Sequence, residues 1–183
     1  MSNIVILIKD EILALNKKYM EEIDKYNHFE EHIGLVLEEA VKQAEKHGAD
    51  LEIVRLGALL HDIALVKGLD RKDHNITGAK LARELLEKYN YPSPRIEKVI
   101  GCVINHRSPK NATNNEEQCV ADADILAHFG NLGMCLNVCK KKNMTMKEIK
   151  QSFEDEFNDL SERAKDGFSA KYNSLCEILF EGI

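Results

Sequence analysis

Apolar residues recur along this chain at intervals of three and four positions, the period of an α-helix. One such face runs through residues 29–47 and is followed by Gly48, a residue suited to a helix C-cap. Asp50 then offers an N-cap for the next helix, through "LEIVRLGALLHDIAL". After Leu56 this second helix is apolar almost all round, so we expect it to be central, buried and continuous to near Gly68.

Polar segments that contain proline or glycine separate the later helices. The stretch "GLDRKDHNIT" is predicted to be a loop, and a helix through "GAKLARELLEKYN" follows it. Ser93 and Pro94 suit the N-cap and first position of a helix through "RIEKVIGCVINHR". After the loop "SPKNATNN", Thr113 with Glu116 forms a capping-box pattern ahead of a helix through "EEQCVADADILAHFG".

The two ends of the chain are predicted to be helical as well. Thr145 and Glu148 repeat the capping-box pattern, and amphipathic helices are expected over residues 145–181. An N-terminal helix is expected over residues 1–20, and both ends would pack on a core of about residues 27–130. The 183 residues are 44% hydrophobic, with only three prolines and ten glycines. We therefore predict a single all-α domain, a compact helical bundle with additional C-terminal helices.

Charge and cysteine content exclude several classes of protein. The formal net charge of −6 gives no positive field that would attract nucleic acid or an anionic membrane surface. The apolar run "IVILI" near the N-terminus is too short for a membrane span and lacks the basic flank of a signal peptide. Five cysteines without a disulfide-framework spacing indicate a reducing compartment. We expect a cytoplasmic protein with neither nucleic-acid nor membrane partners.

The stretch "LGALLHDIAL" places His61 and Asp62 inside an apolar helix, where an unpartnered aspartate would cost several kcal/mol. One interpretation is a structural pair that bonds to a neighbouring helix. Other residues favour a metal site. His32 shares a helical stripe with core positions upstream, and Asp122 and Asp124 begin another apolar helix downstream. Imidazoles and carboxylates from separate helices are the arrangement by which helical bundles build metal sites.

The motifs "HIGLVLEEA", "GALLHDIAL" and "VADADIL" together resemble the HD-domain metal-dependent phosphohydrolases. The signature of that superfamily is a histidine, a later adjacent His-Asp and a distant aspartate. A subgroup is suggested by "GAKLARELL", "IEKVIGCVINHR" and the threonine and glutamate ahead of "DAD". The resemblance implies an HD-type helical fold and one divalent cation held by His32, His61, Asp62 and Asp122.

This ligand set limits the chemistry of the ion. Imidazole and carboxylate ligands without thiolate leave Mn, Fe, Co, Ni, Mg or Zn open. Four protein ligands leave positions on a six-coordinate ion for an activated water and a phosphate oxygen. Asp124, the second carboxylate of the triplet, is not a ligand in the family pattern. On a helix, a residue two positions after Asp122 would point roughly 200° away.

Phosphoryl transfer also needs cations and a proton donor near the phosphate. Besides Asp62, the candidate catalytic residues are His74, His106 and Arg107, and the candidate substrate-binding residues are His28, Lys67, Arg71 and Lys72. Each has a structural alternative. The three loop cations can be solvated charges, His106 and Arg107 can end a helix, and His74 can begin one without a ligand. His128 is expected in ordinary core packing.

The leading hypothesis is a metal-dependent phosphohydrolase that cleaves a phosphate ester or phosphoanhydride of a small molecule, with a nucleotide as the expected substrate. If His74 and His106 hold a second metal, the alternatives are a two-metal phosphodiesterase and a di-iron oxygenase. A third hypothesis is a non-catalytic domain that binds a nucleotide or a protein partner. A homodimer formed through "IVILI" stays open.

Overall fold

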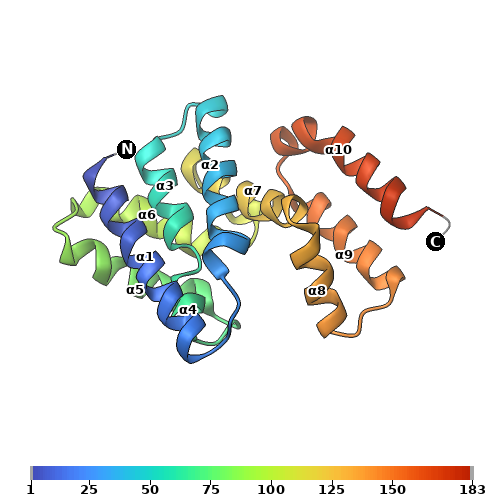
Figure 1. The fold of residues 1–183 in the computed structure, drawn as a ribbon. Coiled ribbons are helices and arrows are strands. Elements are labelled where there is room, and N and C mark those ends of the chain that lie inside the picture. Colours follow the sequence, from blue (N-terminus) through green and yellow to red (C-terminus); the bar gives the residue numbers. More distant parts are fainter. Residues whose placement is uncertain (1, 182–183) are drawn as a thin grey trace.

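The computed structural model describes residues 2–181, and every regular element in that part of the chain is helical, as the sequence predicts (Figure 1). The elements are α1 (Asn3–Glu22), a π-helical turn η1 (Phe29–Ile33), α2 (Gly34–His47), α3 (Leu51–Leu60), α4 (Ile63–Val66), α5 (His74–Lys88), α6 (Ser93–Asn105), a 3-10 turn η2 (Pro109–Asn111), α7 (Asn115–Gly130), α8 (Leu132–Lys141), α9 (Met146–Asp159) and α10 (Glu162–Phe180). None of these helices is both long and apolar enough to span a bilayer.

Two hydrophobic cores lie on either side of α7. Helices α1 to α7 enclose the larger core, and α8, α9 and α10 form a second layer to one side, reached through the C-terminal end of α7 (Figure 1). Val120 and Ala123 of α7 point into the larger core, whereas Leu126 and Phe129 point into the smaller one. Phe129 packs there against the rings of three aromatic residues from α9 and α10. Helix α7 therefore contributes apolar side chains to both cores.

Several predicted helix ends are confirmed. Gly48 adopts the left-handed conformation, with φ 69°, and closes α2. Asp50 caps α3 because its carboxylate accepts hydrogen bonds from the amides of residues 52 and 53. Thr145 and Glu148 form the complete capping box at the start of α9.

Two other helix starts are shifted by one residue from the prediction. Helix α6 begins at Ser93 with Pro92 as its N-cap, so Ser93 is not the cap. The predicted capping box of Thr113 and Glu116 is wrong. The N-cap of α7 is Asn114, whose side chain accepts from the amide of Glu117 at 3.0 Å. The Glu117 carboxylate in turn accepts from the amide of Thr113 at 2.7 Å.

The helix that carries "LLHDIAL" was predicted to be continuous, but the structure shows that it is broken. Helix α3 ends at Leu60, and Asp62 has φ −107° and ψ 21°, outside the helical region, before α4 begins at Ile63. Gly78 of α5 lies against the break, since a Cβ there would sit 3.5 Å from the carbonyl oxygen of His61.

Candidate metal centre

Six histidines and two aspartates converge between the helices of the larger core. His28 precedes η1, His32 lies on η1, and the break between α3 and α4 carries His61 and Asp62. The others are His74 at the start of α5, His106 after the end of α6, and Asp124 and His128 on α7. Asp62 and five of these histidines (28, 32, 61, 74 and 106) are buried. The sequence between residues 28 and 128 thus folds its widely spaced polar residues into one cluster.

The two carboxylate oxygens of Asp62 face two different groups of histidines. Oδ2 lies 2.8 Å from Nε2 of His28, 3.5 Å from Nε2 of His32 and 3.6 Å from Nε2 of His61. Oδ1 lies 3.2 Å from Nε2 of His74 and 3.8 Å from Nε2 of His106. Asp62 therefore stands between two separate sets of possible ligand atoms.

The first set is completed by Asp124. Its Oδ1 lies 3.0 Å from Nε2 of His32 and 3.7 Å from Nε2 of His61, and these two nitrogens are 3.1 Å apart. Together with Asp62 Oδ2 they give two imidazole nitrogens and two carboxylate oxygens from three parts of the chain. In the second set, the Nε2 atoms of His74 and His106 lie 3.0 Å apart.

The tautomers of these histidines show that a metal ion fits. In His61, His74 and His106 the Nδ1 atom lies 2.7 Å from a backbone carbonyl, of Ala58, Arg71 and Val103 respectively. A carbonyl can only accept, so Nδ1 carries the proton and, in the neutral ring, Nε2 presents its lone pair. Two lone pairs that face each other at about 3 Å repel unless a cation satisfies both. A divalent ion does so, and a backbone carbonyl that fixes the ring is the usual support of a metal-bound histidine.

Burial and charge keep His61, His106 and the two aspartates in the protonation states that metal binding needs. Burial lowers the pKa of His106 to about 4 and also lowers the pKa of His61, so both rings are neutral at pH 7. Burial opposes ionisation of Asp62, but the imidazoles around it, among them the hydrogen-bonded His28, hold its pKa well below the usual range. The His32 hydrogen bond and charge likewise outweigh burial and lower the pKa of Asp124.

The structure corrects the predicted aspartate ligand. Asp122 is fully buried, but its carboxylate accepts hydrogen bonds from the backbone amide of Ser161 at 2.9 Å and from the Ser161 hydroxyl at 2.6 Å. It therefore ties α7 to the N-terminus of α10 and faces away from the histidines. The two aspartates point in opposite directions, as predicted, but Asp124 is the one that faces the cluster. The signal that could have identified it is His128, which follows Asp124 at i+4 on the same face.

Two further histidines have roles that the sequence left open or missed. The substrate-binding role predicted for His28 stays a prediction; its Nε2 lies against Asp62, where a protonated nitrogen donates to the carboxylate. His128 was expected in ordinary core packing. Its ring stacks on His32 with centroids 5.3 Å apart, and Nδ1 lies 3.3 Å from the carboxylate of Glu156 on α9. Burial disfavours the charged ring, but Glu156 and Asp124 outweigh burial and raise the pKa of His128 to about 9.

Arg107 is the one predicted substrate-binding or catalytic cation that lines a pocket at the metal centre, among the residues that the structure describes. This pocket also contains Asp124, His128 and Glu156. A hydrogen bond of 3.0 Å from the guanidinium to the carbonyl of Lys72 holds Arg107 in place. The side chains of Lys67, Arg71 and Lys72 are exposed in the turns between α4 and α5, and the substrate-binding role assigned to them stays a prediction.

Comparison with known proteins agrees with this geometry. The family model of the HD domain matches residues 29–128. A predicted HD superfamily hydrolase from an uncultured Thermotogales bacterium superposes with a TM-score of 0.66 at 23% identity, over 93% of this chain and 88% of that one. The Lin1889 protein from Listeria innocua superposes with a TM-score of 0.64 at 22% identity, over 93% of both chains. No curated protein matches the chain. The matched segment is more than half of the chain and contains every residue of the histidine and aspartate cluster except His28, so this protein belongs to the HD-domain family.

Proposed function

We propose that this protein is a metal-dependent phosphohydrolase with a two-ion centre that acts on a small phosphorylated molecule. The observation that carries the proposal is the shared carboxylate of Asp62, whose two oxygens face separate groups of histidines. His32, His61 and Asp124 would complete one ion site with Asp62, and His74 and His106 would complete the other. Divalent ions bound at these positions would lower the pKa of a bound water, which makes it a nucleophile at neutral pH, and would polarise a phosphate oxygen.

The remaining residues of the site prepare it for an anionic substrate. Carbonyl oxygens of three different segments fix the histidine rings, and His28 orients the shared Asp62. Arg107 is anchored by the Lys72 carbonyl and lines the pocket beside Asp124, so its guanidinium is available to a phosphate oxygen there. His128 lines the same pocket and is paired with Glu156, which makes it the candidate donor of a proton to the leaving group.

The same ligand set also suits two iron ions, so a di-iron oxygenase is the second candidate. Both candidates differ from the single-ion hypothesis in metal content. About two ions per chain would support the shared Asp62, and about one would contradict it. Mixed-valence iron with a visible absorption band would favour the oxygenase, and release of phosphate or pyrophosphate would favour the hydrolase.

The experiment is a panel of nucleotides and simple phosphate esters, assayed after loading with Mn²⁺, Co²⁺, Ni²⁺, Mg²⁺ or Fe²⁺. Asp124→Asn and Asp122→Asn form a matched pair, because the same change is made two residues apart on one helix. Turnover should be lost with Asp124→Asn and kept with Asp122→Asn. No turnover by the wild-type protein with any metal and substrate would count against the hydrolase and favour a binding domain.

A further inference from the structure

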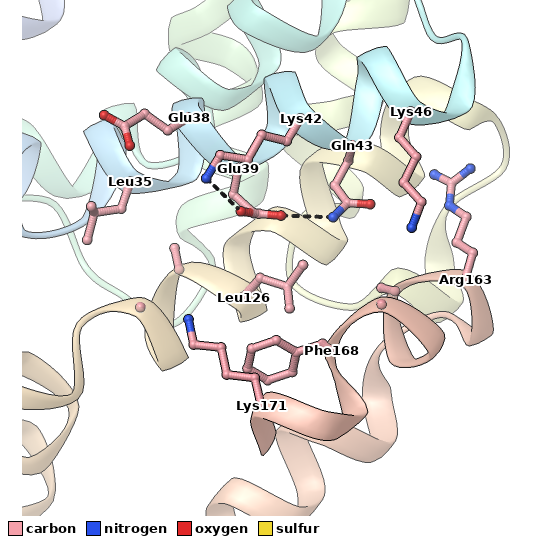
Figure 2. A pocket seen from close by; sticks show the side chains of 14 residues that line it. Leu35, Glu38, Glu39, Lys42, Gln43, Lys46, Leu126, Arg163, Phe168 and Lys171 are labelled. Atoms are coloured by element: carbon pink, nitrogen blue, oxygen red, sulfur yellow. Dashed lines mark hydrogen bonds and ion pairs between the residues drawn. The ribbon is translucent and has the colours of Figure 1, made fainter. Parts of the chain in front are cut away.

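A pocket of about 350 Å³ lies between α2, the end of α7 and α10, and shares no residue with the metal centre (Figure 2). Its volume falls at the low end of the range of about 300–1,000 Å³ that is typical of small-molecule sites. Helix α2 forms one wall with charged and amide side chains. The opposite wall is α10, and Leu126 of α7 lies on the floor together with Phe168 of α10.

The pocket holds a buried acceptor without a hydrogen-bond partner. Gln43 is only 9% exposed, and its Nε2 donates to Oε1 of Glu39 at 2.9 Å. A carboxylate only accepts, so this contact fixes the orientation of the amide and leaves Oε1 as the free end. No hydrogen bond reaches that oxygen from any residue that the structure describes. Figure 2 shows it directed away from Glu39, toward the side on which Lys46 and Arg163 lie. A buried orphan acceptor costs about 1–3 kcal/mol, so the site calls for a donor.

The side chains that line the pocket carry a net positive charge, because Lys42, Lys46, Arg163 and Lys171 outnumber Glu38 and Glu39. Glu39 is neutralised within the pocket by Lys42, whose Nζ lies 3.3 Å from Oε2. Lys46 and Lys171 form no ion pair within residues 2–181. Lys46 reaches across from α2, since a Cβ placed on Gly167 of α10 would lie 3.4 Å from its Nζ. In Figure 2 Lys46 lies at one end of the pocket and Lys171 at the other.

We propose that this pocket is a second ligand site, for a small organic phosphate with a flat apolar body and a hydrogen-bond donor, the chemistry of a nucleoside monophosphate. The phosphate would bind Lys46 at the end beside Arg163. A sugar hydroxyl would donate to Gln43 Oε1, and the base would lie over Leu126 and Phe168. Lys171 would donate to a base acceptor at the far end. Because such a ligand touches both α2 and α10, it would join the metal-binding core to the C-terminal helices.

The test measures binding of AMP, adenosine and inorganic phosphate to the metal-loaded full chain by calorimetry. We expect AMP to bind, with adenosine and phosphate at least tenfold weaker, since each lacks half of the contacts. The variant Lys46→Glu/Lys171→Glu reverses both free charges at exposed positions and should weaken AMP binding at least tenfold. Its matched control, Lys80→Glu/Lys98→Glu, makes the same change on exposed faces of α5 and α6 and should bind like wild type.

Asp62→Asn separates this site from the metal centre. Binding through the pocket should persist in Asp62→Asn and be lost in the double lysine variant. The opposite result, loss in Asp62→Asn and retention in the double lysine variant, would place AMP at the metal centre and overturn the proposal. Phosphate that binds as tightly as AMP, or no AMP binding at several millimolar, would overturn it too. The Asp62→Asn measurements disable the metal centre, so they report on this pocket separately from the proposed hydrolysis.

Discussion

Replacing Asp122 by alanine is expected to destabilise the fold while leaving the metal centre intact. Its buried carboxylate accepts two hydrogen bonds from Ser161, at 2.9 and 2.6 Å, and so holds the start of α10 against α7. A hydrogen bond to a charged group contributes about 1.5–3 kcal/mol. The two bonds share one partner residue and are not independent, so we expect a loss of about 3 kcal/mol in the free energy of unfolding.

In a chain of this length, 1 kcal/mol corresponds to about 2–4 °C in Tm, so the expected decrease is about 6–12 °C. Calorimetric melting gives the shift, and metal analysis of the same sample gives the ion content, which should equal that of wild type. Asp122→Asn can keep an acceptor for the Ser161 amide and should lose about half as much stability. Asp124→Asn should show the reverse, a lowered metal content. If Asp122→Ala lost metal while Asp124→Asn kept it, the assignment of the two aspartates would be refuted.

Three further predictions concern packing, pH and metal. Gly57→Ala should lower the free energy of unfolding in urea by about 1–3 kcal/mol, because the added Cβ would lie 2.6 Å from Cβ of Cys102; an unchanged midpoint would contradict the packing. Burial raises the pKa of Asp50, but hydrogen bonds from Arg95 and two amides outweigh it and lower the pKa. Its stabilisation is therefore present above the unfolded pKa of about 3.9 and lost as pH falls through the folded value, so Arg95→Met should flatten the acid side of a stability–pH curve. Chelation should lower Tm and added Mn²⁺ should restore it; metal loss without a change in Tm would show that the cluster does not need the ion.

The helices were predictable from sequence because each buries one periodic face and ends at residues with clear capping chemistry. Gly48, Asp50 and Thr145 act as their residue types suggest. The break at Asp62 was not predictable, because the apolar run continues through it without glycine or proline. Tertiary contacts, in which several histidines share one carboxylate, determine the local conformation there.

The hydrophobic pattern could not decide between Asp122 and Asp124, and only His128, at i+4 from Asp124, pointed to the second of them. A helix with one apolar face reveals its rotation in the spacing of its hydrophobic residues. Helix α7 contributes to both cores, so its apolar residues do not mark a single buried face. Their spacing therefore does not reveal how the helix is rotated about its axis. The family pattern identified the triplet, and only the contacts with Ser161 and His32 show which carboxylate faces the metal centre.

Helix α7 has no solvent-exposed face, and this limits which amino-acid substitutions the protein can accept. Most helices can change freely on their exposed side, and sequence drift accumulates there. Between Cys119 and Phe129 of α7 only Asp124 and His128 are not buried, and both belong to the metal centre. A library of random substitutions should therefore show low tolerance throughout this segment, with no stripe of neutral positions. Substitutions should instead be tolerated in α1, α5 and α10, because each of these helices keeps an exposed side.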